Sequence, residues 1–151
     1  PFKKYDADDI AAFLSLLPKD VEGLKLRHVL ELRHETFLSK DFIAQARQAN
    51  VGIVLADTPK YPLIADLTSD FVYLRLQDAK PEIETGYELK ALDKWVALAR
   101  AWQRGEEPDE FPRVAPNGDK LQARDVFVYF INGAKERAPA AAEAMISILA
   151  T

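Results

Sequence analysis

Two carboxylates, Glu31 and Asp57, lie at the carboxyl ends of two successive apolar segments of the chain. Arginines occur near them: Arg33 is two residues after Glu31, and Arg75 lies near the end of the next apolar segment. Two carboxylates can perform acid–base work when neighbouring charges push their pKa values apart. We therefore predict that Glu31 and Asp57 are catalytic, and that Arg75 is a third catalytic residue that clamps an anionic substrate.

The same charged side chains also permit an interpretation without chemistry. Glu31, Arg33, Asp57 and Arg75 carry two positive and two negative charges. They can form a self-neutralising buried network, although such networks are costly to desolvate. His34 would add a nitrogen ligand for a divalent metal, but the arginines disfavour a cation and three ligands are few. We expect neither a metal nor a cofactor, and both interpretations of the charges stay open.

A second chemical signal follows the last apolar segment, which continues into Asn132-Gly133-Ala134-Lys135-Glu136-Arg137 and a helix that starts near Pro139. Gly133 allows close backbone approach, while Lys135 and Arg137 supply positive charge. In many (β/α)8 barrels, loops of this kind and the N-terminus of a helix bind a phosphate. We predict phosphate or carboxylate binding here. The alternative is that Lys135 and Arg137 only flank a solvated loop.

Other binding residues are predicted from their position in the sequence. Tyr87 directly follows the loop 77–86, which can fold over the opening of a site. His28 is expected to be structural, and no serine lies in a nucleophile-elbow motif, which argues against a Ser-His-Asp triad. The residues expected to bind substrate are Arg33, His34, Tyr73, Tyr87, Asn132 and Lys135.

Four short segments are typical of buried parallel strands, because each is rich in aliphatic or aromatic residues and bounded by polar or turn residues. They are Arg27–Arg33, Val51–Ala56, Phe71–Leu76 and Asp125–Ile131. Helices are expected at Asp6–Leu17, Ser39–Ala49, Tyr87–Arg104 and Pro139–Ala150, with Asp6 and Ser39 as N-caps. This alternation predicts an α/β fold with a parallel sheet, in one domain over residues 1–151. Residues 105–124 are expected to form an irregular surface loop.

Side chains alternate between the two faces of a strand, and this periodicity orients the predicted sheet. One face of each strand is wholly apolar and is expected to pack on helices. The other face is expected to become polar towards the carboxyl end of each strand, where barrels place their sites. The polar set on that face is Glu31, Arg33, Asp57, Tyr73, Arg75 and Asn132.

Composition narrows the functional classes. The chain has 151 residues, enough for one domain with a core, and a formal charge of −4, which gives no bulk attraction for nucleic acid. The absence of cysteine excludes disulfides, thiolate metal sites and a thiol nucleophile. No apolar run approaches the ~18 residues that a membrane span needs, and no signal peptide opens the sequence. We therefore expect a cytoplasmic protein with no nucleic-acid or membrane partner.

Several of these segments together resemble the YecE-like family, also called domain of unknown function 72. The resemblance covers nearly the whole chain, in the order and spacing of that family. It is carried by LELRHETF at 30–37, LADT at 55–58, DFVYLRL at 70–76, and VFVYFINGAK at 126–135 with its continuation to 142.

The resemblance implies a TIM-type barrel of which this chain is the C-terminal half, with the predicted strands as the fifth to eighth. The family's N-terminal half carries a Gly-Thr-Ser-Gly-Trp-like first strand and a Gln-x-Pro-Pro-like turn, and neither is present here. The chain therefore looks cut between the fourth strand and the following helix. Half a barrel leaves two sheet edges open, so we expect either a homodimer or a partner that is the missing N-terminal half.

The family supplies a fold and a site but no established reaction. One hypothesis is an enzyme acting on a small anionic, for example phosphorylated, substrate through Glu31 or Asp57. The other is a non-catalytic ligand-binding or interaction protein whose buried charges are structural. The residue types are compatible with either hypothesis.

Overall fold

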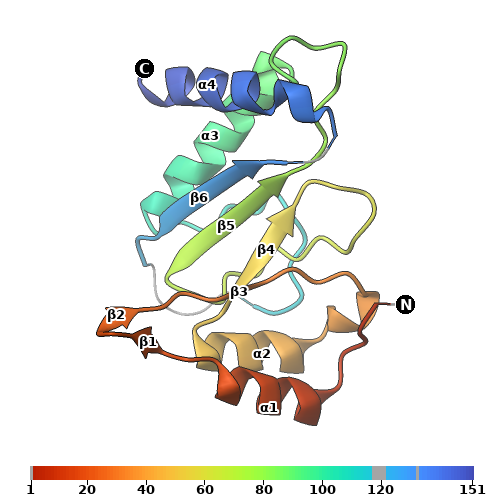
Figure 1. Cartoon of the computed structure of the whole chain (residues 1–151), viewed down its shortest axis with the longest axis vertical. Coiled ribbons are helices and arrows are strands. Elements are labelled where there is room, and N and C mark those ends of the chain that lie inside the picture. The colour runs from red at the N-terminus through yellow and green to blue at the C-terminus, as the bar shows by residue number, and fades with distance from the viewer. Residues whose placement is uncertain (1, 117–121, 132) are drawn as a thin grey trace.

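The computed structural model describes residues 2–116, 122–131 and 133–151. Asn132, one of the predicted binding residues, lies outside the described residues. A four-stranded sheet forms the centre of the molecule, with helices packed against it (Figure 1). None of the helices in the described part of the chain has the length and apolarity needed to span a bilayer.

The sheet is parallel throughout and its strands follow the chain order β3-β4-β5-β6. Its strands are β3 (Val29–Leu30), β4 (Gly52–Ala56), β5 (Phe71–Leu76) and β6 (Asp125–Phe130). The α/β class and the parallel sheet predicted from the sequence are therefore confirmed. The first strand is shorter than the expected Arg27–Arg33, because only Val29 and Leu30 pair with β4.

The four predicted helices are confirmed at α1 (Ala7–Leu16), α2 (Lys40–Ala49), α3 (Leu89–Gln103) and α4 (Ala138–Leu149). Asp6 and Ser39 act as N-caps, since their side chains accept the amides of Asp9 and Phe42. Two short 3-10 helices, η1 (Glu35–Phe37) and η2 (Lys135–Arg137), were not predicted.

A small hairpin between α1 and β3 was also not predicted. Strands β1 (Asp20–Val21) and β2 (Leu24–Lys25) pair antiparallel. Glu22 and Gly23 connect them with φ angles of 51° and 80°. Two successive residues at positive φ are the signature of a type I′ turn, which favours glycine.

Helices cover one face of the sheet, and two clusters of side chains form the core there. One cluster joins β4, β5, α3 and α4 through residues such as Leu74, Leu92 and Met145. The other joins β4 with α1 and α2 through Ile53, Phe42 and Ile10. We call this side of the sheet the covered face.

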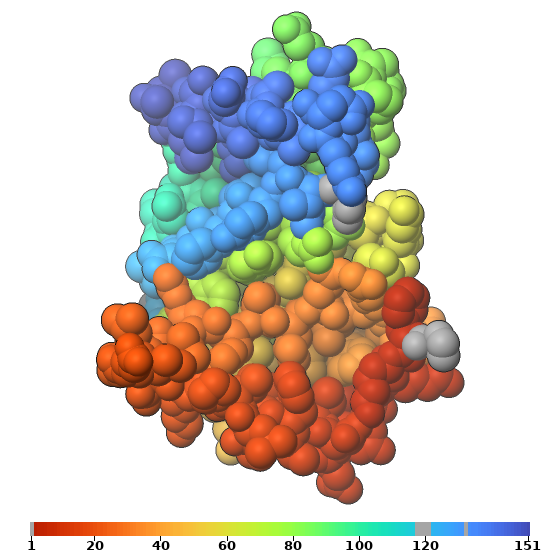
Figure 2. All heavy atoms as spheres, in the orientation of Figure 1, coloured from red at the N-terminus to blue at the C-terminus, as the bar shows by residue number. Residues whose placement is uncertain are grey.

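No helix within residues 2–116, 122–131 and 133–151 packs on the opposite face, which we call the open face. The strand registers pair Tyr73 with both Val54 and Phe127, and Arg75 with Tyr129, so these side chains share the open face. Figure 2 shows atoms of β5 and β6 at the surface between the β2–β3 segment and α4. Arg27 covers one end of the open face, with its guanidinium 5.3 Å from the Phe71 ring and 4.8 Å from the Phe127 ring.

These registers correct part of the orientation predicted from the sequence. The polar face was assigned correctly in β5, because Tyr73 and Arg75 lie on the open face. It was assigned wrongly in β6, since Val126, Val128 and Phe130 pack on the helix-covered core. The polar face was also assigned wrongly in β4, because Ile53 and Leu55 are core residues. Asp57, two residues after Leu55, is therefore directed towards the covered face as well.

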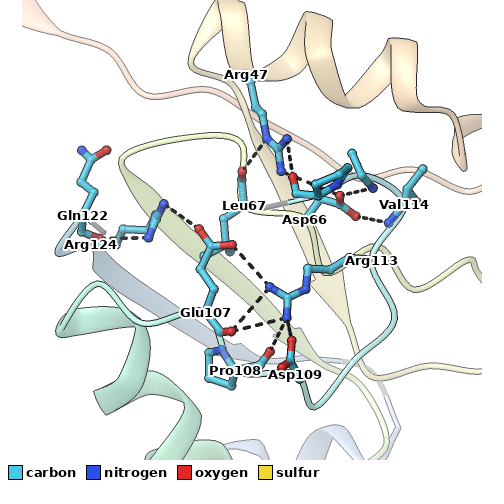
Figure 3. Close-up of polar contacts among 12 residues, drawn as sticks. Arg47, Asp66, Leu67, Glu107, Pro108, Asp109, Arg113, Val114, Gln122 and Arg124 are labelled. Carbon is cyan, nitrogen blue, oxygen red and sulfur yellow. Dashed lines mark hydrogen bonds and ion pairs between the residues drawn. The ribbon is translucent and has the colours of Figure 1, made fainter. Parts of the chain in front are cut away.

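The described part of the long segment after α3 is irregular, as expected, and many of its residues are exposed, but buried charges also fasten it to the sheet (Figure 3). Arg113 forms ion pairs with Glu107 and Asp109, and Arg124 reaches the other oxygen of Glu107 at 3.4 Å. The side chains of Glu107 and Arg124 are only 9% and 7% exposed. Arg124 also donates to the carbonyl of Ser69, just before β5, at 3.2 Å.

A second acidic centre, Asp66, continues this network towards α2. Its carboxylate is fully buried and accepts the amides of Val114 and Ala115 at 2.8 Å each. Arg47, near the end of α2, lies 3.9 Å from it and donates to the carbonyl of Leu67 at 3.3 Å. Three arginines and three carboxylates balance one another here, so the network is structural. It lies near the amino ends of β5 and β6, away from the predicted site.

Candidate functional site

Glu31 is held by two arginines at the carboxyl end of the sheet. Arg33 donates from Nε to Glu31 Oε1 at 3.0 Å, and Arg75 forms an ion pair with Oε2. The Glu31 side chain is 15% exposed, against 28% for Arg75 and 45% for Arg33. The structure thus brings three of the predicted site residues together. Two guanidinium groups around one carboxylate leave a net positive charge, which favours an anion over a metal ion.

A hollow of about 360 Å³ lies over the open face beside this cluster. The rings of Tyr73 and Tyr129 stack in it, with centroids 4.9 Å apart and planes at 21°. Its floor therefore combines aromatic and aliphatic surface with one ion pair. The lining residues are Val29, Glu31, Val54, Tyr73, Arg75, Tyr129 and Ile131.

Asp57 belongs to a separate cluster. One of its carboxylate oxygens accepts the amide of Gln77, and the other accepts the hydroxyl of Tyr87 at 2.8 Å. The Tyr87 oxygen in turn accepts the amide of Asp78 at 2.8 Å. The predicted pairing of Asp57 with Glu31 is therefore wrong: the two carboxylates have different partners, because Asp57 follows the covered-face alternation of β4.

The environment of Asp57 makes it the better acid–base candidate of the two. Burial raises its pKa to about 6, the hydrogen bonds from Gln77 and Tyr87 act in the opposite direction, and the charge of Asp78 raises it again. Burial and the neighbouring Asp57 carboxylate also raise the pKa of Tyr87, whose hydroxyl stays protonated. A carboxyl group that titrates near neutral pH can exchange a proton under ordinary conditions.

His34 has a local structural role. It is the N-cap of η1, and its Nδ1 accepts the amide of Thr36 at 3.2 Å. Arg33 lies over the rings of Phe2 and Tyr61, at 5.8 Å and 5.0 Å from their centroids. These contacts orient Arg33 towards Glu31, whereas His34 contributes to the turn that follows it.

The largest pocket described at this end of the sheet, about 560 Å³, is formed by the segments that follow β4, β5 and β6. We call it the mouth pocket. Its charged lining is three lysines, Lys60, Lys80 and Lys135, and one carboxylate, Asp78, which pairs with Lys80 at 2.7 Å. Thr58, Pro59, Tyr61, Gln77, Ala79 and Gly133 complete the lining. Lys135 is where the sequence predicted it, in a pocket at the ends of the strands.

Two details of the predicted anion site need correction. Arg137 does not line this pocket; its Nε donates to the carbonyl of Pro81 at 3.0 Å. The close approach at Gly133, whose φ is 56°, is to the chain itself. A Cβ there would lie 2.7 Å from the carbonyl oxygen of Ala79 and 2.8 Å from that of Gln77.

The mouth pocket and the hollow are successive levels of one surface. Gln77 lies two residues beyond Arg75, and Gly133 lies two residues beyond Ile131. Residues two apart along a strand lie on the same face, so both members of each pair lie on the same side of the sheet. Two residues of strand cover about 6.6 Å. A ligand in the mouth pocket would therefore lie directly beyond the Glu31–Arg75 ion pair.

Sequence reasoning missed Lys60, Lys80 and Tyr129. The first two were detectable, since each lysine is the fourth residue after the end of its strand, at Ala56 and Leu76. Tyr129 was missed because the faces of β6 were assigned the wrong way round. Among the described residues no group of three or more His, Cys, Asp or Glu side chains could hold a metal ion.

Comparisons with known proteins agree on one family. The family model described as "Protein of unknown function DUF72" matches residues 1–151. A DUF72 family protein from Thermotoga maritima superposes with a TM-score of 0.60 at 18% identity, covering 100% of this chain and 55% of that one. A DUF72 family protein from Enterococcus faecalis superposes with a TM-score of 0.57 at 14% identity, covering 95% and 53%.

No curated protein matches the sequence. At these identities the two solved structures support the fold alone. The chain spans about half the length of each of them.

Proposed function

The chain belongs to the DUF72 family, and we propose that it binds a small anionic ligand, such as a phosphorylated metabolite, in the mouth pocket. The observation that carries the proposal is the convergence of Lys60, Lys80 and Lys135 from three different loops on one pocket. The chain as a whole is acidic, with a formal charge of −4. Concentrating positive charge in one concave place therefore creates a local potential that attracts anions.

The groups beneath the pocket support the same ligand class. Lys80 is partly neutralised by Asp78, but among the described residues no ion pair engages Lys60 or Lys135. One level below, Arg33 and Arg75 outweigh the single charge of Glu31. Phosphate and carboxylate groups accept several hydrogen bonds from such donors at once.

Titration calorimetry with inorganic phosphate tests the proposal. We expect binding that weakens with ionic strength and is lost in the double variant Lys60→Ala/Lys135→Ala. Lys90→Ala is the matched control, because Lys90 is an exposed lysine of α3 outside the pocket. Phosphate affinity that is equal in all three proteins would show that the lysines do not form a site.

If the protein is an enzyme, Asp57 is the residue we propose as acid or base. Its raised pKa, about 6, suits proton transfer near neutrality, and its neighbours Thr58 and Gln77 line the pocket. Turnover of phosphoesters that is abolished in Asp57→Asn, with phosphate affinity retained, would support catalysis.

The alternative is a non-catalytic binding protein, and the geometry at Glu31 favours it. Arg33 and Arg75 both pair with that carboxylate, so its role in the structure is to hold the two guanidinium groups in place. In that case Glu31→Gln would lower stability and raise anion affinity, because it removes the negative charge that offsets Arg33 and Arg75 beneath the pocket.

We further propose that the sheet is half of a (β/α)8 barrel, corresponding to strands five to eight. Purely parallel sheets are normally covered on both faces, yet here the open face carries Tyr129 at 45% exposure. The match covers 55% of the similar Thermotoga chain, so slightly less than half of that chain has no counterpart in the present protein. A partner that completes the ring would cover the open face and leave the mouth pocket at the rim.

The helices indicate which partner fits. In the described residues β3 and β6 each lack a strand on one side. A second copy would pair its β3 with this β6, only about 4.8 Å away. It would then bring its α1 into the space already taken by α4, and each helix is about 10 Å wide. A complementary polypeptide with strands at both ends fits both edges without this clash, so we favour it over a homodimer.

A further inference from the structure

We infer that Asp57 and Tyr87 form a proton-dependent clasp on the loop 77–86, so that anion binding in the mouth pocket is coupled to uptake of a proton. The inference deepens the proposed anion binding and rests on it. Its basis is the placement of one carboxylate between the end of β4 and two backbone amides of the loop.

The clasp joins three parts of the molecule. Asp57 directly follows β4, the amides of Gln77 and Asp78 belong to the loop, and Tyr87 lies two residues before α3. The Gln77 amide and the Tyr87 hydroxyl donate to the two oxygens of Asp57, while Tyr87 accepts the Asp78 amide. The loop residues held in this way, Gln77 and Asp78, are also part of the pocket lining.

The space between Asp57 and Tyr87 has room for one hydrogen. The two oxygens are 2.8 Å apart, and the hydroxyl hydrogen of Tyr87 occupies that line when Asp57 is ionised. If Asp57 gains a proton on the same oxygen, two hydrogens compete for one position. Whichever of the two hydrogens stays on that line, the other loses its acceptor, and the clasp is weakened.

The charged and titratable groups that influence Asp57 come from two sides. Tyr87 approaches from the start of α3, and Asp78 and Lys80 approach from the loop. Burial, opposed by the hydrogen bonds, raises the pKa of Asp57 to about 6. A modest change in the charge near Asp57 therefore changes the fraction of Asp57 that is protonated near neutral pH.

An anion in the mouth pocket is such a change. It would lie against Thr58, the residue after Asp57, and against Gln77, which donates to Asp57. Added negative charge favours the protonated carboxyl group. By reciprocity, protonation of Asp57 strengthens anion binding, so affinity rises as the pH falls towards 6.

Sulfate is the suitable probe, because it does not titrate near neutral pH. Calorimetry at pH 6.5 in two buffers of different ionisation enthalpy measures the protons taken up per sulfate bound. We expect uptake on the order of half a proton for the native chain and none for Asp57→Asn. In Tyr87→Phe the maximum uptake should move to higher pH, since Asp57 loses a hydrogen bond that lowers its pKa.

Tyr5→Phe is the matched control, because the Tyr5 hydroxyl bonds Gln45, far from the loop, at 3.3 Å. Sulfate binding without proton uptake, or equal uptake in Asp57→Asn, would overturn the inference. A ligand-free measurement keeps the clasp testable if sulfate does not bind. The amide NMR shifts of Gln77 and Asp78 should titrate near pH 6 and become flat in Asp57→Asn.

The two measurements separate the possible failures. Amides that titrate in a chain that binds no sulfate would refute the proposed function and leave the clasp standing. Amides that do not titrate would refute the clasp, whatever the sulfate result.

Discussion

Arg75 of β5 reaches past β4 to the carboxylate of Glu31, which follows β3, so a single ion pair connects non-adjacent strands of the sheet. Strand β3 is otherwise joined to the sheet by only two paired residues, Val29 and Leu30. The ion pair thus anchors the outermost strand at its carboxyl end. It also fixes the guanidinium of Arg75 under the mouth pocket.

Glu31→Gln should therefore destabilise the fold. The amide loses the charge that two arginines face, and removing one member of a mostly buried pair costs about 2–3 kcal/mol. Urea unfolding measures this change. Asp9→Asn is the control, because Asp9 pairs with Lys3 at the exposed surface and should leave the midpoint unchanged. Equal midpoints for Glu31→Gln and the native chain would contradict an anchoring role.

Two adjacent residues in the segment after α3 allow a buried carboxylate to be compared directly with an exposed one. Glu107 is 9% exposed and binds Arg113 and Arg124, whereas the adjacent Glu106 is 53% exposed and pairs with Arg104. We predict that Glu107→Gln lowers the free energy of unfolding by about 3 kcal/mol, since it removes the negative charge that faces both Arg113 and Arg124. Glu106→Gln should have no measurable effect. Similar thermal midpoints for the two variants would show that the network is not structural.

Asp57 should make stability depend on pH in an unusual direction. Its pKa is raised from about 3.8 to about 6 on folding, so the folded state binds the proton more tightly. Its contribution to stability is therefore present at low pH and is lost as the pH rises from about 4 to 6. Asp57→Asn keeps an acceptor for Gln77 without a charge. The variant should be more stable at pH 7, by at most about 3 kcal/mol.

The difference between the two proteins should shrink towards pH 4, where Asp57 is protonated. Comparing them by urea unfolding at both pH values removes the contribution of the other carboxylates. A variant that is less stable than the native chain at pH 7 would show that the charged form of Asp57 is the one the fold favours.

The helices and three of the four strands could be predicted from the sequence, because the signals that define them are local. Asp6 and Ser39 are strong capping residues placed before amphipathic stretches, and β4, β5 and β6 are runs of β-branched and aromatic residues. The pairing of Glu31 with Arg33 and Arg75 could also be predicted, because alternation puts these residues on one face.

The orientation of β4 and β6 could not be predicted, because both of their faces are apolar. In VGIVLA and DVFVYF the period-2 pattern carries no polarity that distinguishes one face from the other. A one-residue error then reverses every side chain, which is how Asp57 was placed beside Glu31. The Glu107 network was missed because its members lie in irregular segments, where no periodicity indicates burial.

The last prediction concerns the two edge strands of the sheet, β3 and β6, each of which lacks a neighbouring strand on one side in the described residues. Helices α1 and α4 flank them with exposed apolar side chains: Leu16 is 81% exposed and Ile146 is 64% exposed. We expect the chain alone to bind a fluorescent apolar dye while folded, and expect Leu16→Lys and Ile146→Lys to reduce that binding without loss of stability. Leu24→Lys is the control, since Leu24 is 74% exposed on the hairpin rather than on α1 or α4.

Sedimentation of the same variants identifies the partner. If a complementary polypeptide covers these helices, the isolated native chain should show only weak association, with no discrete dimer. A stable dimer that both Leu16→Lys and Ile146→Lys abolish would mean that α1 of one copy packs on α4 of the other. That result would overturn the steric argument, because the two helices would then share the space above paired β6 and β3 strands.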